Sequence, residues 1–422
     1  MTETMKSPVV SLFSGAMGLD LGLEQSGIKT TLAVEVDPHC CSTIRQNRPA
    51  LDVWESDIQR IDGESIRARL HRPKDIFLMV GGPPCQSFCP GGKRAALSDP
   101  RGNLIYTYLN LIQEIRPCFF VLENVANLVT AALRHRPIAE RPGKHWNLSV
   151  YDRKKGDHGN DSLPMEPDEL SGSAIRQIIT DVRTLGYQIS LSVVDAAEYG
   201  APQHRLRFLM FGARDTSAPK IPSPTHGERA ADSRPFQTVR DAIHDLRDNS
   251  GPHSEYTSDV AKYFAMIPPG GNWRNLPKHI QREALGDASF EAGGGKTGFF
   301  RRLSWGYPSP TITGRANRKG SALCHPDFIR PLSVRECARL QGFPDDWCFT
   351  GAMNRQYMQI GNAVPVHLGA MIGRTLLQSG TGEHGRSGPE EHLEMALEKA
   401  VMRLRSSARN KRGKDDRQTT LF

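Results

Sequence analysis

Cys85 follows an apolar run at a point where the chain is stiffened. Residues 75–80 have the composition of a buried parallel strand, and two glycines and two prolines separate this run from Cys85. Open α/β sheets hold ligands at the carboxyl ends of such strands, so the thiol is expected beside a ligand. Its thiolate is nucleophilic, and the residues up to Arg94 suit a loop that closes over an anion. The alternative is a turn with an incidental buried cysteine.

A carboxylate occupies the equivalent place on another predicted strand. Residues 119–122 are a second apolar run, and Glu123 stands at its carboxyl end. Burying a carboxylate there is costly unless it is paired or used. Glu123 and Cys85 therefore converge on one crevice if both strands are parallel, whereas an acid that caps the next helix is the simpler alternative.

Two arginines share one face of a further strand. In the stretch 200–211 a turn leads into apolar residues, and the two-residue period places Arg205 and Arg207 side by side. Adjacent guanidinium groups repel, so a shared anion or carboxylate is expected nearby. A solvated face of an edge strand is the alternative.

The amino-terminal segment predicts a nucleoside site. Residues 8–13 read as a strand that ends in a turn with Gly15 and Gly18, and Glu35 ends the next strand, 20 residues after Gly15. An acid there can bind the two hydroxyls of a ribose. The turn lacks the full dinucleotide pattern and suits a nucleoside without pyrophosphate, such as S-adenosylmethionine, with Phe13 on the adenine and Asp57 accepting from its amine. An ordinary turn with Phe13 in the core is the alternative.

Strands alternate with helices up to about residue 214, which predicts a doubly wound, mostly parallel sheet. The pattern is broken by a polar insertion over 131–172 and changes after residue 215 to proline, glycine and short polar runs. Ser333 and Glu336 form a capping box before a helix that Gly342 ends. Residues 357–365 read as a turn before an apolar helix near 366–377.

Composition restricts the class of protein. The 422-residue chain has a net charge of +8 and a pI of about 9.1, which favours a polyanionic partner. No apolar run approaches the ~20 residues of a membrane span, and the polar start lacks a signal-peptide core. The eight cysteines lack the spacing of a zinc site, so we expect no metal and a reducing, cytoplasmic location.

The motifs together, in their order along residues 8–378, resemble the bacterial cytosine-C5 DNA methyltransferases, either of restriction-modification systems or standing alone. The segments that carry the resemblance are 13–18, Glu35, Asp57, 83–86, 123–125, 203–207, 339–344 and 361–364. Three positions depart from the family pattern: Ser11 stands where Asp is usual, Met17 where Gly is usual, and Cys89 where Ser or Thr is usual.

The resemblance implies two domains and a basic tail. The catalytic and cofactor-binding domain comprises residues 1–214 plus 351–378, the small target-recognition domain 215–350, and the tail 379–422. Base-reading loops are expected within 215–325. Cofactor contacts are expected from Phe13, Gly15, Gly18, Glu35, Asp57, Ile58, Leu104 and Asn362.

The implied reaction transfers a methyl group from S-adenosylmethionine to C5 of a cytosine flipped out of duplex DNA. Carbon 5 is a poor nucleophile until the Cys85 thiolate adds at C6. Glu123 then acts at N3, and Arg207 with Arg205 orients the base and the nucleophile. A tRNA methyltransferase, a DNA-binding protein that lost catalysis, and a nicotinamide oxidoreductase are alternatives. The long small-domain segment favours DNA over tRNA as the substrate. A DNA-binding protein without catalysis and a nicotinamide oxidoreductase would leave Cys85 and Glu123 without a role.

The tail carries two further signals. Leu393, Leu397, Val401 and Leu404 fall on one helical stripe. The final residues Gln418–Phe422 resemble the peptides that dock on bacterial sliding clamps, delivered by a flexible basic tail, although a random polar end is the alternative. A cognate restriction endonuclease and a nucleoid-associated location are also implied by the family.

Overall fold

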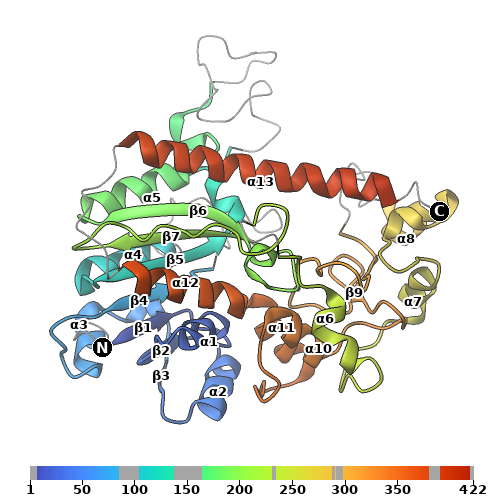
Figure 1. Ribbon diagram of the computed structural model, residues 1–422, viewed down its shortest axis with the longest axis horizontal. Coiled ribbons are helices and arrows are strands. Elements are labelled where there is room, and N and C mark those ends of the chain that lie inside the picture. The colour runs from blue at the N-terminus through green and yellow to red at the C-terminus, as the bar shows by residue number, and fades with distance from the viewer. Residues whose placement is uncertain are drawn as a thin grey trace.

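The computed structural model describes residues 7–84, 104–136, 164–230, 234–287, 290, 298–379 and 390–418, and in the last segment only the side chains of residues 392–406. A seven-stranded sheet forms the centre of the larger body, and the loop-rich segments lie beyond its carboxyl edge (Figure 1). The predicted strand at residues 75–80 is displaced slightly and covers Leu78–Gly81.

The sheet has the order β3-β2-β1-β4-β5-β7-β6. All neighbouring pairs are parallel except those that β7 makes with β5 and β6. The predicted doubly wound, mostly parallel sheet is therefore confirmed. The strands are β1 (Val9–Leu12), β2 (Leu32–Glu35), β3 (Asp52–Glu55), β4 (Leu78–Gly81), β5 (Phe119–Val125), β6 (Gln188–Asp195) and β7 (Leu206–Ala213).

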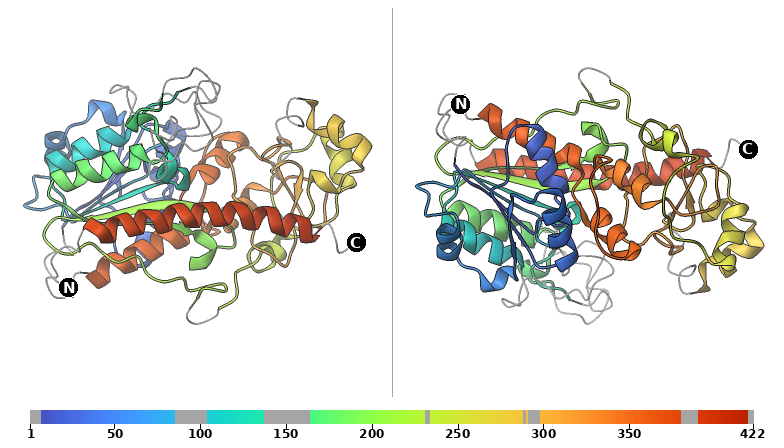
Figure 2. Two further views of the ribbon diagram at one scale, coloured as in Figure 1. Left: turned by 90° about the horizontal axis from the view of Figure 1, so that it is seen from above. Right: turned by 90° about the horizontal axis from the view of Figure 1, so that it is seen from below.

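Alternate residues of the buried strands pack into two separate hydrophobic cores, one on each face of the sheet. On β5, Phe120 and Leu122 pack on one face, whereas Phe119 and Val121 pack on the other. The first face is covered by α3 (Gly63–Arg69), α4 (Leu104–Ile115) and α5 (Ser173–Thr184), and the second by α1 (Gly18–Gln25) and α12 (Val366–Ser379) (Figure 2). A further helix, α2 (Pro38–Asn47), follows β2.

Helices α1 and α12 touch backbone to backbone. A Cβ atom on Gly22 would lie 2.1 Å from the Val366 oxygen, and one on Gly369 would lie 2.2 Å from the Leu19 oxygen. Only glycine fits at these crossings. The close contact joins the carboxyl-terminal part of the larger body to its first helix, although 344 residues separate Ser26 from its partner Ala370.

The helix predicted from the capping box is present as α10 (Val334–Gln341). The Ser333 hydroxyl accepts from the Glu336 amide, and Gly342 ends the helix in the left-handed region. The next prediction was wrong. Residues 357–362, expected in a turn, belong to the helix α11 (Met353–Asn362). Its glycine is needed for packing, because a Cβ atom on Gly361 would lie 2.2 Å from the Gly314 nitrogen.

Residues after 215 contribute to two cores. Helices α6 (Val239–Ile243), α10 and α11 share a core with Met17, Leu21 and Ile44 of the first segment. A separate core is built around Phe264, Trp273 and Phe300 by α7 (Ser258–Ala265), α8 (Lys278–Leu285), β8 (Arg301–Arg302) and β9 (Leu323–Cys324).

Residues 390–418 of the tail, which was expected to be flexible, form one long helix. Helix α13 (Glu390–Gln418) runs along β6 and continues toward α8 (Figures 1 and 2). Its predicted stripe packs on the sheet core, where Leu397 and Ala400 are buried. Arg403 forms an ion pair with Glu198 in the turn after β6. The helix thereby covers the edge strand, which limits pairing with other chains.

The described ends of the predicted insertion are anchored. Ala131, Met165 and Leu170 are buried, and Arg136 pairs with the buried Glu169 at 2.5 Å. Residues 137–163 lie outside the described part of the chain.

Candidate active site

Most of the predicted site residues gather at the carboxyl ends of the parallel strands. Strand β1 lies between β2 and β4, so the chain leaves it in opposite directions on its two sides. Such a switch point forms the ligand crevice of doubly wound sheets. Phe13, Glu35, Asp57 and Gly82 follow or end the strands that meet at this edge.

Glu123 and Arg207 form a buried ion pair. The register of β5 on β7 places Val125 opposite Arg207, and the Arg207 Nε lies 2.6 Å from the Glu123 Oε1. Glu123 is 6% exposed. Burial raises the pKa of Glu123, while the charges of Arg207 and Arg205 act against this rise. The carboxylate expected near the two arginines is therefore Glu123, but only Arg207 forms an ion pair with it.

Arg205 has a different environment from Arg207. Its guanidinium is buried and donates to the Ile312 oxygen at 2.7 Å and to the Gly361 oxygen at 2.8 Å. Burial lowers the pKa of Arg205, and the nearby charge of Arg207 adds to this effect. Arg205 thus joins β7 to the segment before β9 and to the end of α11.

The root of the cysteine loop is attached to the same place. A Cβ atom on Gly82 would lie 2.7 Å from the Glu123 Oε2. The side-chain Nδ2 of Asn124 donates to the Pro83 backbone oxygen at 3.0 Å. Cys85 itself lies outside the described residues, which stop at Pro84. The described part of the loop therefore leaves the sheet in contact with Glu123.

Backbone amides fix the position of the Glu35 carboxylate at the end of β2. Its Oε2 accepts from the Gly15 amide at 2.7 Å, and its Oε1 accepts from the amides of Val36 and Asp37. Gly15 has a φ of 53° and nothing within 4 Å of an added Cβ atom. The turn therefore leaves open space beside a fixed carboxylate, as a ribose requires.

Phe13 and Gly18 flank this turn. Phe13 is half-buried with a φ of 56°, and Met17, at the position where the family has glycine, also has a positive φ of 65°. Gly18 has a packing role, because a Cβ atom there would lie 2.3 Å from the Val364 oxygen. The first turn and residues 362–364 are thus neighbours.

The remaining predicted cofactor residues differ in exposure. Asp57 is half-exposed, and its Oδ1 accepts from the Gln59 amide at 3.0 Å. Ile58 is buried, Leu104 is half-buried at the start of α4, and Asn362 is exposed at the end of α11. The donors and acceptors at this edge suit an adenosine with a free diol and no phosphate.

Sequence reasoning missed a buried amide network. The Gln203 side chain donates to Gln341 Oε1 at 2.6 Å and accepts from the Ile312 amide at 3.0 Å. Gln341 in turn donates to the Ile360 oxygen at 2.6 Å. Both glutamines lie in the quoted motifs, but only the fold shows that they meet. Asn124 was also part of a motif without an assigned role.

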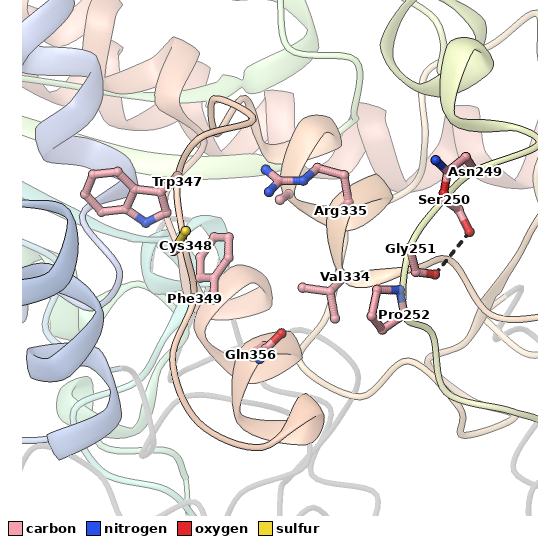
Figure 3. A pocket seen from close by; sticks show the side chains of 11 residues that line it. Asn249, Ser250, Gly251, Pro252, Val334, Arg335, Trp347, Cys348, Phe349 and Gln356 are labelled. Carbon is pink, nitrogen blue, oxygen red and sulfur yellow. Dashed lines mark hydrogen bonds between the residues drawn. The ribbon is translucent and has the colours of Figure 1, made fainter.

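A cavity with described walls lies away from the predicted site residues. It has a volume of about 410 Å³ and is enclosed by residues 249–252, α10 and residues 347–349 (Figure 3). None of the predicted site residues lines it. The described residues also contain no cluster of three or more metal-ligating side chains, and no described helix could cross a membrane.

Comparison with known proteins identifies the family. The family model for C-5 cytosine-specific DNA methylases matches residues 8–137 and 168–378. Type II methyltransferase M.Eco47II of Escherichia coli is 37% identical over 375 residues, which cover 87% of this chain and 78% of that protein. M.PspPI of Psychrobacter is also 37% identical, over 88% of this chain and 79% of that protein.

The chain therefore belongs to the C-5 cytosine-specific DNA methylase family. It is a DNA (cytosine-5-)-methyltransferase with S-adenosylmethionine as the methyl donor and DNA as the substrate, as the motifs predicted. A crystal structure of a DNA modification methyltransferase encoded within an E. coli prophage has the same fold, with a TM-score of 0.55 at 23% identity over 89% of this chain and 100% of that one.

Proposed function

We propose that the reaction proceeds through a covalent bond between Cys85 and C6 of a flipped-out cytosine, with Glu123 acting at N3 and Arg207 orienting both. The observation that carries this proposal is the buried Glu123–Arg207 pair, which lies against Gly82 at the root of the Cys85 loop. A pair placed there has no evident structural need for its buried charge.

In the first step the Cys85 thiolate adds to C6 and the π electrons of C5–C6 move toward C5 and N3. Glu123 hydrogen-bonds or protonates N3, which stabilises the charge that develops. When bound, the cofactor supplies an electrophilic methyl group, which the enamine-like C5 takes up. Water then removes the C5 proton, the C5–C6 double bond forms again, the thiolate leaves, and a proton placed on N3 returns to Glu123.

Glu123 must hold a proton for part of the time near neutral pH. Its burial raises its pKa toward that range, whereas the guanidinium of Arg207 limits the rise. Arg207 also fixes the direction of the carboxyl group, because one oxygen is paired with its Nε. Arg205 is proposed to act through the packing of β7 rather than by touching the base.

The cofactor is proposed to lie at the switch point. Glu35 would hold the ribose diol, Phe13 the adenine face and Asp57 the adenine amine, with Ile58, Leu104 and Asn362 around them. Gly15 provides the open backbone turn, while Gly18 holds this turn against residues 363–364. Residues 215–350 are proposed as the target-recognition domain, supported by the separate core around Phe264.

Trapping on a duplex that contains 5-fluorocytosine tests the covalent step. Fluorine at C5 blocks the final elimination, so we expect a stable adduct on the Cys85 peptide by mass spectrometry, formed only with cofactor present. Cys85→Ser should give no adduct and no methyl transfer while still binding DNA. Cys89→Ser is the matched control in the same loop and should be trapped like the wild type. An adduct on Cys89, or undiminished transfer by Cys85→Ser, would refute the proposal.

Two further expectations concern the cell. Because its relatives are named type II methyltransferases, we propose that this enzyme protects DNA from a cognate endonuclease and acts on the nucleoid in the bacterial cytoplasm. DNA modified by the enzyme should resist the nuclease that cuts the same sequence. Cleavage of fully modified DNA would contradict a protective role.

A sliding clamp is proposed as a partner of residues 418–422. Helix α13 extends to Gln418, and the last four residues lie outside the described part of the chain. Deleting the last five residues should abolish capture on immobilised bacterial clamp without changing methyl transfer to short duplexes. Equal capture of the full and shortened chains would end this proposal.

A further inference from the structure

The segment between Ile312 and β9 begins at the active site. The Ile312 amide donates to Gln203, and the Ile312 oxygen accepts from the Arg205 guanidinium. Arg205 stands directly before β7, the strand that carries Arg207. The first residue of this segment is therefore attached to the strand that carries the buried ion pair.

The same segment also touches the predicted cofactor side. A Cβ atom on Gly314 would lie 2.9 Å from the Met358 Cα, and Gly361 and Gly314 meet through their backbones. The Arg205 guanidinium bridges both parts, since it donates to Ile312 and to Gly361. Thr313 and Gly314 thus lie where the end of α11 approaches the catalytic strand.

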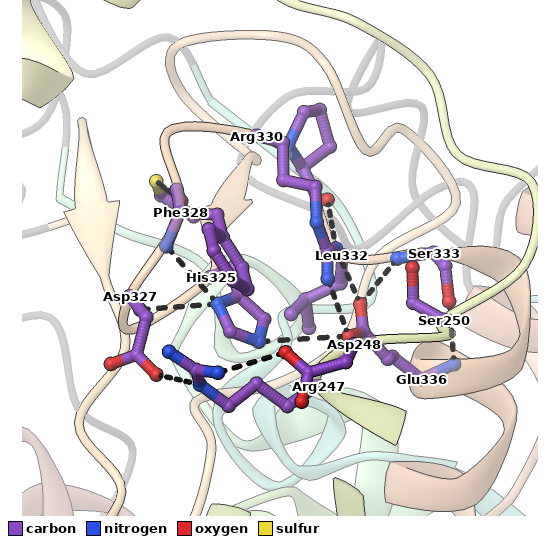
Figure 4. Close-up of polar contacts among 12 residues, drawn as sticks. Arg247, Asp248, Ser250, His325, Asp327, Phe328, Arg330, Leu332, Ser333 and Glu336 are labelled. Carbon is purple, nitrogen blue, oxygen red and sulfur yellow. Dashed lines mark hydrogen bonds and ion pairs between the residues drawn. The ribbon is translucent and has the colours of Figure 1, made fainter. Parts of the chain in front are cut away.

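The other end of the segment is equally well held. Strand β9 pairs with β8, and the chain then enters a buried polar cluster at His325 (Figure 4). His325 Nδ1 accepts from the amides of Asp327 and Phe328, and Glu336 binds the two terminal nitrogens of Arg330 at 2.8 Å. These contacts fix the chain that follows β9.

The loop itself is defined as residues 313–321. Hydrogen bonds from its side chains to backbone oxygens stabilise it. The Ser321 hydroxyl donates to the Arg315 oxygen at 2.6 Å, and the Lys319 ammonium donates to the Leu285 oxygen at 2.7 Å. Lys319 therefore binds the last turn of α8.

Three side chains of the loop have no bonded partner among the residues that the structure describes. Arg315, Asn317 and Arg318 are exposed, and within the described part of the chain none of them has an ion pair or a side-chain hydrogen bond. Exposed arginines are common on protein surfaces. Here, however, two of them and an amide stand on a loop that directly follows Ile312, which is bonded to Arg205, and that ends before β9, which is paired with β8.

We propose that the loop 313–321 reads base edges beside the target cytosine, with Arg315 and Arg318 each recognising a guanine. This inference rests on the proposed flipping of the cytosine toward Glu123. Neighbouring bases of a strand stack about 3.4 Å apart, so the base pairs that flank the target lie close to any group at the active-site mouth. Arginine recognises guanine through two parallel hydrogen bonds to O6 and N7.

Replacement by lysine separates base reading from phosphate binding. Lysine keeps the charge that a phosphate needs but loses the fork that contacts two guanine atoms. We would let the wild type, Arg315→Lys, Arg315→Ala, Arg318→Lys and Arg318→Ala methylate one plasmid and map 5-methylcytosine by bisulfite sequencing. Arg374→Ala, an exposed arginine of α12, is the matched control.

For each arginine we expect the lysine and alanine variants to lose preference for guanine at one position of the site, by roughly 5- to 150-fold. Cofactor affinity and melting temperature should stay at the wild-type values, and the control should keep both rate and sequence context. Two results would overturn the inference: lysine variants with unchanged context while alanine weakens all sites equally, or a wild-type site without flanking guanine.

The wild type reports separately on the underlying reaction. A failure of the proposed Cys85 chemistry would appear in the wild type as absent trapping on 5-fluorocytosine DNA. A failure of the loop inference would leave wild-type trapping intact and would appear in the mapped sequence context, either as lysine variants with an unchanged context or as a wild-type site without flanking guanine.

Discussion

At the scale of single residues, Glu123 combines opposing influences on one proton. Burial favours its neutral form, and the paired Arg207 favours its charged form. The balance suits a group that must both hold and release a proton during one reaction.

Replacing Glu123 with glutamine tests this role. Glu123→Gln keeps the shape and a hydrogen-bond donor but cannot transfer a proton. We expect methyl transfer in single-turnover assays to slow by ~10²–10⁴-fold, while cofactor affinity by calorimetry stays unchanged. Glu64→Gln, an exposed acid on α3, is the control and should behave as the wild type. An unchanged single-turnover rate in Glu123→Gln would remove the carboxyl group from the mechanism.

Asp20 supplies a prediction about pH and stability. It is buried on α1 and accepts from the Thr30 hydroxyl at 2.6 Å, and burial raises the pKa of Asp20 from 3.8 to about 6. Below pH 3.8 the acid is neutral in both states and causes no penalty. As the pH rises to 6 the unfolded chain ionises first, so stability is lost across this window.

We therefore expect Asp20→Asn to raise the free energy of unfolding at pH 8 by about 2–3 kcal/mol, since its amide oxygen can still accept from Thr30. Urea unfolding at pH 8 and at pH 3.5 checks this. The gain should disappear at the lower pH, and an equal gain at both values would assign it to packing instead.

At the scale of elements, α10 is the clearest case in which local sequence specifies structure. Its first turn is closed by Ser333 and Glu336, each of which bonds the backbone amide of the other. The helix then presents Leu340 and Gln341 to the core and to the buried amide network.

Removing this cap should cost stability by a predictable amount. We expect Ser333→Ala to lower the free energy of unfolding by about 1–2 kcal/mol in urea titrations. Thr257→Ala is the matched control, because Thr257 stands at the same position of α7 but its side chain makes no capping bond. Equal losses in the two variants would show that the hydroxyl bond contributes nothing particular.

At the scale of the whole molecule, charge must steer the enzyme to DNA. The chain carries a net charge of +8, and Glu123 at the active site is buried and paired with Arg207. Association with a polyanion is then driven by the release of counterions.

This predicts a strong dependence of DNA affinity on salt. With about four phosphates contacted, the affinity of Cys85→Ser for a duplex should fall ~100-fold between 50 and 200 mM salt. Fluorescence anisotropy measures the slope, and cofactor affinity under the same conditions is the control and should hardly change. A flat salt response for DNA would contradict electrostatic binding.

Much of this could be predicted because the signals are local. The apolar run before Cys85 predicted the strand β4, and the sequence predicted that Arg205 and Arg207 lie near each other and near a carboxylate, which is Glu123. Gly361 shows the limit. A glycine near a chain reversal favours a turn, but here it lies within α11 because Gly314 passes too close for a side chain.

The sequence by itself determined the order of strands and helices, the family, and the residues whose side chains could take part in catalysis. Each of these depends on neighbours along the chain. Only the tertiary structure decided which arginine pairs with Glu123 and which holds backbone carbonyls. It also placed α13 over the sheet edge and the loop 313–321 beside the active site. These arrangements join residues that are 84 to more than 150 positions apart, such as Arg205 and Gly361. Such pairings are set by the packing of whole elements, and no local pattern encodes them.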